Sequence, residues 1–364
     1  MPLVAHSTLP AFARLQADGQ EVVPLARAKQ QHIRELHVGV LNMMPDAALE
    51  ATERQFMRRL GSSSRIVQLY VHLFTVPGLS RGPAAQAHID QYYQDFNDIK
   101  REGLDALVIS GANVTQPDLT QEAFFPHMLE VFEWARTHVA SVMCSCLASH
   151  ALWQHEYGIR RTRLPYKRWG VFRHRVQMRA HPLVSNINTR FDTPHSRFND
   201  VSVSELQQAG AQVLVTSEDC EVLLATSADG LSAIYLQGHP EYDTLSLAKE
   251  YKREVSRFFY KERSDYPALP IDYLSPPARD LLNGFREAVI CAAREGGDLP
   301  EFPEDALLNL VDNTWADTCK AIFANWLGLV YQTTHQDRCK HLMDELDADD
   351  PIGWRARMAE RQEV

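Results

Sequence analysis

The chain has 364 residues, 45% of them hydrophobic and 23% charged, which provides for a large core and excludes a disordered or fibrous protein. Its formal net charge of −10 argues against a nucleic-acid-binding protein, which needs a basic surface, but still allows a local basic pocket for an anionic ligand. The N-terminus has no signal-peptide pattern, and no segment is apolar over the length that spans a bilayer. We therefore expect a cytoplasmic protein that does not enter a membrane.

Short apolar runs alternate with segments of helical periodicity through the first two-thirds of the chain. We expect strands at residues 37–42, 65–71, 105–110, 139–143, 212–215, 222–225 and 232–237. We expect helices at residues 50–60, 124–138, 147–157 and 247–259. This order predicts an α/β fold with a mainly parallel sheet flanked by helices, in which ligands gather at the carboxyl ends of the strands.

The rest of the chain is expected to complete a single catalytic domain over residues 1–364, with a core at about 36–262. Prolines cluster near Pro267 and Pro277 and precede a helical stretch, so 263–313 is expected to be an inserted segment. Apolar periodicity predicts a helix between Trp315 and Leu342, so 314–344 should be a C-terminal helix packed on the core. Residues 345–364 are expected to be a polar, frayed tail.

Six cysteines in a chain without an export signal predict reduced thiols and no disulfide framework. Cys144 and Cys146 are separated by one residue, which is too few for the usual zinc knuckle, and no second pair lies at ligand spacing. We therefore expect no metal site.

Cys146 stands where a strand is expected to end and a helix to begin, which is the position of a nucleophile elbow. A helix N-terminus favours the thiolate, and the backbone N–H of Leu147 would be placed to stabilise an oxyanion. Cys144 and Ala148 are small enough for the elbow, although the commonest form has glycine at both places. The alternative is a buried core cysteine, the more frequent outcome for a thiol after a strand.

The segment Gly238–Asp243 directly follows another expected strand. His239 and Glu241 are two residues apart in an extended segment, so their side chains point the same way. A carboxylate beside an imidazole fixes its tautomer and stabilises the imidazolium. Together with Cys146 the pair predicts a Cys–His–Glu triad, whereas the segment alone could be a turn with a hydrogen-bonded histidine.

With these residues in place, the sequence resembles the homoserine O-succinyltransferase family, which belongs to methionine biosynthesis. The family fold resembles class I glutamine amidotransferases, so the resemblance implies a flavodoxin-like fold. The segment from about Ser264 to Asn313 is longer than the family form that we would expect. The matching stretches are Leu41–Pro45, Glu53–Phe56, Ser110–Ala112, Glu133–Trp134, Cys146, Tyr157–Ile159, Lys167, Gly170–Val171, Pro194–Arg197, Gly238–Asp243 and Asn325–Leu327.

The resemblance implies that Cys146 carries the acyl group as a thioester, that His239 is the general base and that Glu241 is its partner. It implies L-homoserine as acceptor and an acyl-CoA, succinyl-CoA, as co-substrate, with no bound cofactor and with ping-pong transfer. Together with the apolar helix near the C-terminus, it also suggests a homodimer.

Three further residues match substrate-binding positions of the family: Lys167, Ser196 and Arg253. Arg253 lies on an expected helix and could hold the homoserine carboxylate, or be a solvated charge. Lys167 lies in a very polar stretch that could be a surface basic patch. Ser196 follows Pro194 and His195 in what reads as a turn, where its hydroxyl could contact substrate or only cap the turn.

The acyl-specificity position of the family aligns with Thr115, where the family has glutamate for acetyl transfer and glycine for succinyl transfer. A glutamate would repel the distal carboxylate of succinate, and uncharged Thr115 would not, so we favour succinyl-CoA over acetyl-CoA.

Two other readings remain open. A glutaminase of the amidotransferase type would share the fold and the triad, although the glycines around Cys146 are missing. A non-catalytic binding module of this fold would have no need for all three triad residues.

Overall fold

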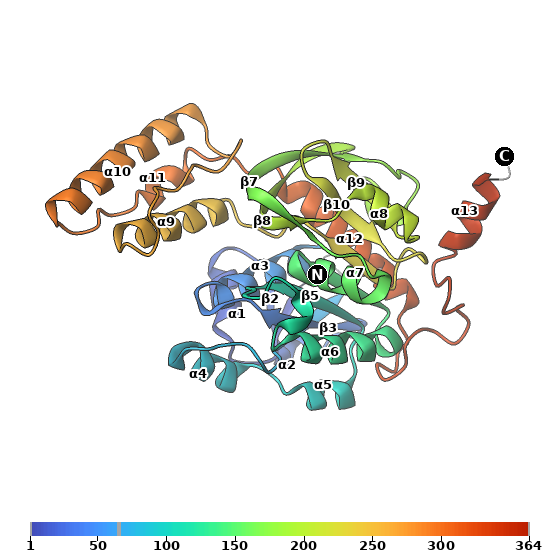
Figure 1. The fold of residues 1–364 in the computed structure, drawn as a ribbon. Coiled ribbons are helices and arrows are strands. Elements are labelled where there is room, and N and C mark those ends of the chain that lie inside the picture. Colours follow the sequence, from blue (N-terminus) through green and yellow to red (C-terminus); the bar gives the residue numbers. More distant parts are fainter. Residues whose placement is uncertain (1, 64–66, 363–364) are drawn as a thin grey trace.

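The computed structural model describes residues 2–63 and 67–362. Its centre is an eleven-stranded sheet in the order β2-β1-β4-β3-β5-β6-β11-β10-β9-β7-β8 (Figure 1). The strands are β1 (Leu3–Ala5), β2 (Val22–Pro24), β3 (Glu35–Met43), β4 (Gln68–Phe74), β5 (Ala106–Ala112), β6 (Ser141–Ser145), β7 (Thr162–Val176), β8 (Arg190–Asp200), β9 (Gln212–Ser217), β10 (Glu221–Thr226) and β11 (Ala233–Leu236).

The part of the sheet from β2 to β11 is parallel throughout, and β10, β9, β7 and β8 continue it as an antiparallel extension. The predicted mainly parallel sheet with flanking helices is confirmed. The flanking helices are α1 (Pro10–Ala17), α2 (Leu25–Ala28), α3 (Leu49–Ser62), α4 (Pro83–Tyr92), α5 (Phe96–Glu102), α6 (Phe125–His138), α7 (Leu147–Tyr157), α8 (Val203–Gln208) and α12 (Ala316–Thr333).

Side chains of the parallel strands alternate between two hydrophobic layers, as the pleat of a strand requires. On β5, Ala106 and Val108 join the layer that includes Phe56 of α3 and Trp326 of α12. Leu107 and Ile109 of the same strand join the opposite layer, beneath α6 and α7. The parallel part of the sheet is therefore covered on both faces, so we look for residues that contact a ligand at the ends of its strands.

The antiparallel hairpin β7–β8 was not predicted, because its charged residues obscure the alternation of a strand. Its inner residues are nevertheless buried, and Arg197 pairs with Asp200 at 2.8 Å within the fold. The register breaks between Arg163 and Arg168, where β7 has extra residues relative to β8. The turn expected around Pro194 is wrong, since this residue lies inside β8.

An arm made of α9 (Ser246–Phe259), α10 (Pro276–Glu295) and α11 (Glu304–Leu308) projects to one side of the sheet (Figure 1). It has its own hydrophobic cluster, in which Tyr251 of α9 packs with Leu282 of α10 and Trp315. Trp315 also donates a hydrogen bond from Nε1 to the carbonyl of Tyr242 at 2.8 Å. The segment 263–313 supports α9 through this cluster, and its Tyr273 Oη donates to the carbonyl of Thr244, in the loop that follows β11, at 2.7 Å.

The C-terminal part differs from the expected long helix and frayed tail. Helix α12 ends at Thr333, because Thr334 is extended and its hydroxyl donates to Asp105 at 2.7 Å. The chain later forms α13 (Trp354–Gln362), and Trp354 is buried against the ring of His181.

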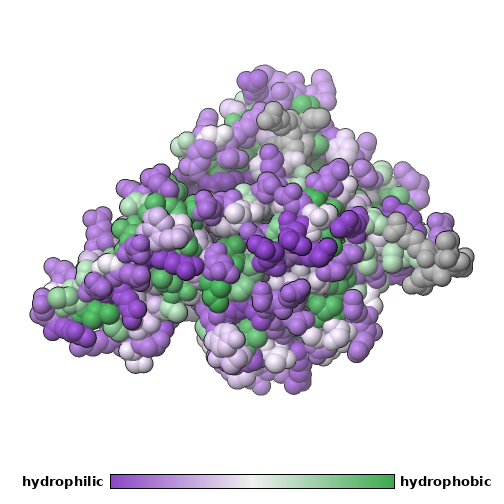
Figure 2. Space-filling view, turned by 90° about the horizontal axis from the view of Figure 1, so that it is seen from above, coloured by the Kyte–Doolittle hydropathy of each residue, from purple (hydrophilic) through white to green (hydrophobic). Residues whose placement is uncertain are grey.

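The apolar residues that suggested a dimer, Ile322, Trp326 and Leu329, are buried within this chain. They therefore supply no free surface for a second copy. Seen from above, the molecule is mostly hydrophilic, with hydrophobic residues in small groups (Figure 2). Among the helices of residues 2–63 and 67–362, none is long and apolar enough to cross a bilayer.

Candidate active site

The predicted elbow is present at Cys146, between β6 and α7. Its backbone has φ 50° and ψ −105°, a conformation that costs energy in any residue other than glycine and is held here by its surroundings. The N–H of Cys146 donates to the carbonyl of Leu236 on β11 at 2.6 Å, and the hydroxyl of Ser149 donates to the carbonyl of Cys144 at 2.9 Å. The N–H of Leu147 lies in the first turn of α7, where helix geometry provides no acceptor.

The predicted histidine and glutamate lie beside the elbow because β11 pairs directly with β6. His239 Nδ1 is 2.8 Å from Glu241 Oε1, and both side chains are buried. The His239 ring stacks on Tyr242 at 4.4 Å between centroids. Burial alone would lower the pKa of His239, but the Cys146 thiolate and the Glu241 carboxylate outweigh it and raise the pKa well above its usual value. This arrangement favours the imidazolium form of His239.

Glycine at position 238 has a steric reason. A Cβ there would lie 2.8 Å from the ring of His195, so only glycine allows this approach. The N–H of His239 donates to the carbonyl of Pro194 at 2.8 Å, which ties the triad histidine to β8. The hairpin therefore positions His239 from behind.

Lys167 and Ser196, which the sequence predicts to bind substrate, meet at Glu250, a residue of α9 that the sequence did not single out. Glu250 Oε2 accepts from Lys167 Nζ at 3.0 Å and from Ser196 Oγ at 2.6 Å. Its Oε1 accepts from Tyr242 Oη at 2.7 Å. Burial would raise the pKa of Glu250, but Lys167 and these hydrogen bonds lower it, so the group is a carboxylate. The signal in the sequence was its position, three residues before Arg253 on the same helix.

Arg253 lies near this cluster but does not join it. Its side chain is 47% exposed, and its nearest carboxylate is Glu254 at 4.0 Å. It borders two cavities, of about 1110 and 520 Å³, that meet at Cys146. The smaller cavity is also lined by His239 and Glu250. Arg253 is thus available for an anion next to the nucleophile.

Thr115 lies in the loop after β5 and lines the larger cavity together with Cys146. Buried Glu122 approaches this loop from the protein side. Its Oε1 accepts from the N–H of Thr115 at 2.5 Å and from the N–H of Gln116 at 2.6 Å. The side chain of Thr115 is uncharged, and the nearby carboxylate of Glu122 accepts hydrogen bonds from these two backbone N–H groups.

Cys144 is fully buried in the hydrophobic layer beneath α7, and burial raises the pKa of its thiol well above the usual value. It therefore differs from Cys146, which borders both cavities.

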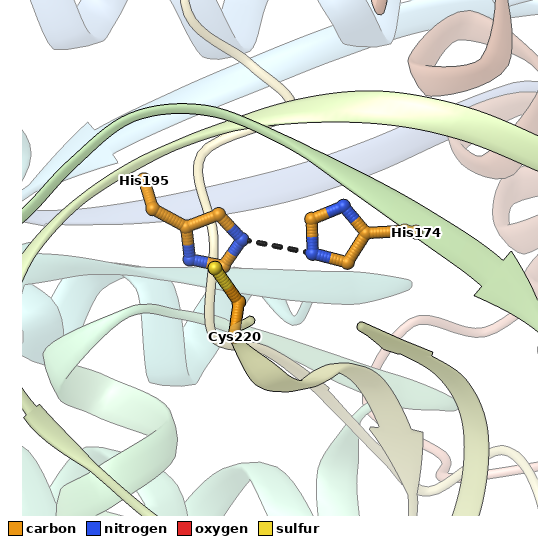
Figure 3. A group of neighbouring side chains, drawn as sticks. All are labelled: His174, His195 and Cys220. Atoms are coloured by element: carbon orange, nitrogen blue, oxygen red, sulfur yellow. Dashed lines mark hydrogen bonds between the residues drawn. The ribbon is translucent and has the colours of Figure 1, made fainter. Parts of the chain in front are cut away.

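His174, His195 and Cys220 form a second, buried group of ligand-type residues (Figure 3). His174 Nδ1 donates to the carbonyl of Phe172 at 2.8 Å, and Arg197 Nε donates to His195 Nδ1 at 3.1 Å. Burial lowers the pKa of His174 to about 3 and that of His195 well below its usual value. Both rings are therefore neutral, and His195 Nε2–H donates to His174 Nε2 at 3.1 Å. This bond uses the lone pair that a metal would need, and the buried Arg197 cation would repel a metal, so these residues fit a structural role.

The profile of the homoserine O-succinyltransferase family matches residues 2–336. The chain belongs to this family. Homoserine O-succinyltransferases of Methylobacter tundripaludum and Methylococcus capsulatus are each 55% identical over 353 residues, covering 97% of this chain and 100% and 99% of the relatives. This chain is accordingly an acyltransferase of methionine biosynthesis.

Because the alignments cover 97% of this chain, the segment 263–313 is part of these relatives as well, and the expectation that it exceeds the family form is wrong for them. Solved structures found by shape include glutamine amidotransferases of Thermotoga maritima and Methylobacillus flagellatus. The first is 12% identical with a TM-score of 0.44 and covers 83% of this chain and 100% of that chain. The second is 14% identical with a TM-score of 0.46 and covers 81% and 95%.

Proposed function

We propose that this chain transfers the succinyl group of succinyl-CoA to the side-chain hydroxyl of L-homoserine through a thioester on Cys146. The observation that carries the proposal is the position of Cys146. Its backbone is strained, its side chain borders both cavities, and the buried His239–Glu241 pair lies beside it. We infer the two substrates from the reaction that names the family to which the chain belongs.

In the first half-reaction, the Cys146 thiolate attacks the thioester carbonyl of succinyl-CoA. The N–H of Leu147 stabilises the oxyanion of the tetrahedral intermediate. The intermediate collapses when the bond to the CoA sulfur breaks, and the His239 imidazolium gives its proton to that sulfur. CoA leaves with its thiol protonated, and Cys146 carries the succinyl group.

In the second half-reaction, neutral His239 takes the proton of the homoserine hydroxyl while the oxygen attacks the thioester. The bond to Cys146 then breaks, which returns the thiolate beside an imidazolium and releases O-succinylhomoserine. Glu241 stabilises the positive charge on His239 at this point. One imidazole thus serves as acid in the first half and base in the second.

Homoserine carries both an ammonium and a carboxylate, and the smaller cavity offers a partner for each. Arg253 is placed to bind the carboxylate as a guanidinium fork. Glu250 is placed to bind the ammonium, with Lys167, Ser196 and Tyr242 fixing its position. Glu250→Gln should therefore raise the KM for homoserine roughly tenfold or more and leave acylation by succinyl-CoA nearly unchanged. The exposed Glu262→Gln is the matched control.

For the donor, we propose succinyl-CoA over acetyl-CoA, because the Thr115 side chain is neutral and the Glu122 carboxylate is bound to backbone N–H groups. Thr115→Glu would add an anion to the cavity and should depress succinyl transfer far more than acetyl transfer. The decisive assay crosses homoserine and serine with succinyl-CoA and acetyl-CoA. A wild-type preference for acetyl-CoA of roughly tenfold in kcat/KM would contradict the proposal.

A glutaminase activity is the competing function for this triad, and a glutamine hydrolysis assay on the wild type measures it.

We place the enzyme in the cytoplasm, where its acyl-CoA substrate is made. We also propose a homodimer, on the family resemblance alone. Sedimentation velocity tests it, and a monomer at micromolar concentration would refute it.

A further inference from the structure

The larger cavity beside Cys146 has an uneven distribution of charge. Two of its arginines pair with an acidic side chain: Arg257 is 3.3 Å from Glu254, and Arg263 is 2.9 Å from Glu254. In contrast, Arg161 and Arg163 have no ion pair with any carboxylate among residues 2–63 and 67–362. In a chain of net charge −10, two unpaired arginines in one cavity suggest an anionic ligand.

These two arginines are also arranged for one ligand. Arg161 directly precedes β7 and Arg163 is its second residue, and both side chains line the larger cavity. Burial lowers the pKa of Arg161, and the nearest anions, Glu122 and the Cys146 thiolate, offset this only in part. Arg161 is thus a half-buried cation near the nucleophile, and Arg163 lies further out on the exposed part of the hairpin.

Two aromatic rings stand at the outer part of the same cavity. Tyr166 is 75% exposed and Phe198 is 45% exposed, although both are large hydrophobic residues. Tyr166 lies in the stretch where β7 has extra residues relative to β8. Because these residues have no partner on β8, the side chain of Tyr166 remains exposed. The guanidinium of Arg163 lies 5.6 Å from the centroid of the Phe198 ring. Exposed aromatic faces beside cations are typical of surfaces that stack a nucleobase.

We propose that this cavity is the binding site for the nucleotide end of the acyl-CoA, with Arg161 and Arg163 on its phosphates and Tyr166 and Phe198 against its adenine ring. The inference rests on the proposed function, because it assigns the donor of that reaction to one of the two cavities at Cys146. The volume of about 1110 Å³ greatly exceeds what homoserine needs and suits a long cofactor-like molecule. The smaller cavity is a poorer site for phosphates, because its Lys249 and Lys252 both pair with Glu304.

The two cavities would then have separate roles. The CoA enters from the hairpin side and presents its thioester to Cys146, while homoserine enters from the side of His239 and Glu250. Substitutions of Arg163 should therefore weaken the binding of acyl-CoA and leave the binding of homoserine unchanged.

The test measures CoA binding by titration calorimetry for the wild type, Arg163→Glu and Tyr166→Ala. We expect the Kd of Arg163→Glu for CoA to rise roughly 10- to 100-fold and that of Tyr166→Ala roughly fivefold or more. Adenosine 3′,5′-bisphosphate should compete with CoA on the wild type. Arg173→Glu, on the same strand, 72% exposed and outside the cavity, should bind CoA as the wild type does.

A second measurement separates this inference from the function. Succinyl-N-acetylcysteamine has the thioester but no nucleotide, so its kcat/KM should be the same for Arg163→Glu and the wild type. Equal CoA affinity of Arg163→Glu and the wild type, or an equal loss with both donors, would overturn the assignment while leaving the succinyl transfer intact. Arg163-dependent CoA binding by a wild type that cannot transfer succinyl to homoserine would instead refute the proposed function.

Discussion

Cys146 and His239 follow two directly paired strands in the parallel half of the sheet, whereas Lys167 and Ser196 lie on the antiparallel hairpin and Glu250 and Arg253 lie on the arm. The first pair sits on buried strands covered on both faces. The second set depends on how a hairpin and a helix, distant in sequence, pack against that centre. We therefore expect changes at the triad in the parallel half to affect chemistry, and changes on the hairpin and the arm to affect binding.

The largest effects should come from the nucleophile and its base. Cys146→Ala should abolish acyl transfer, since no other thiol borders both cavities among residues 2–63 and 67–362. His239→Ala should lower kcat roughly 10²- to 10⁴-fold, because the proton of homoserine loses its acceptor. Steady-state assays with unchanged circular dichroism measure both. Near-normal turnover of Cys146→Ala would show that acyl transfer does not need the thiol at the end of β6.

Glu241→Gln should have the next largest effect, and one that depends on pH. Glu241 helps to raise the pKa of His239, so its loss lowers that pKa and the imidazolium disappears at lower pH. Fewer thiolate–imidazolium pairs then exist near neutral pH, and alkylation of Cys146 by iodoacetamide should slow there. The rate from pH 5 to 9 measures this. A profile that matches the wild type would mean that Glu241 does not act on His239.

On the arm, Arg253→Leu should raise the KM for homoserine roughly 10- to 100-fold, because a charged partner of the carboxylate is lost. Acylation of Cys146 by succinyl-CoA should remain close to normal. Arg257→Leu, one turn later and already paired with Glu254, is the control. If acylation fails while the homoserine KM stays unchanged, the division between the two halves is wrong.

The smallest effect should come from Cys144→Ala, although this residue is only two positions from the nucleophile. Cys144 is buried and its thiol has a raised pKa, so it is a packing residue. Activity should stay within about threefold, with a modest loss of stability from the small cavity. An acyl group found on Cys144 by peptide mapping would contradict this.

The same comparison explains what the sequence could and could not predict. Cys146, His239 and Glu241 follow apolar strands whose ends meet at one edge of a parallel sheet. The local sequence pattern was therefore sufficient to predict that these three residues lie together. The hairpin was missed because buried Arg197 and half-buried Arg168 both have Asp200 as a partner, and such pairing is visible only in three dimensions. Glu250 looked like any charged residue on a helix surface, since the arm that carries it is placed by contacts far along the chain, such as the bond from Trp315 to Tyr242.

The central claim is that Cys146 carries the acyl group between the two substrates. The most direct test is intact-protein mass spectrometry after mixing the enzyme with succinyl-CoA in the absence of homoserine. We predict a mass increase of one succinyl group, mapped to Cys146, and its disappearance when homoserine is added, with O-succinylhomoserine formed in equal amount. An unmodified enzyme that still transfers succinyl in a single step, or a succinyl group on any other residue, would contradict the account.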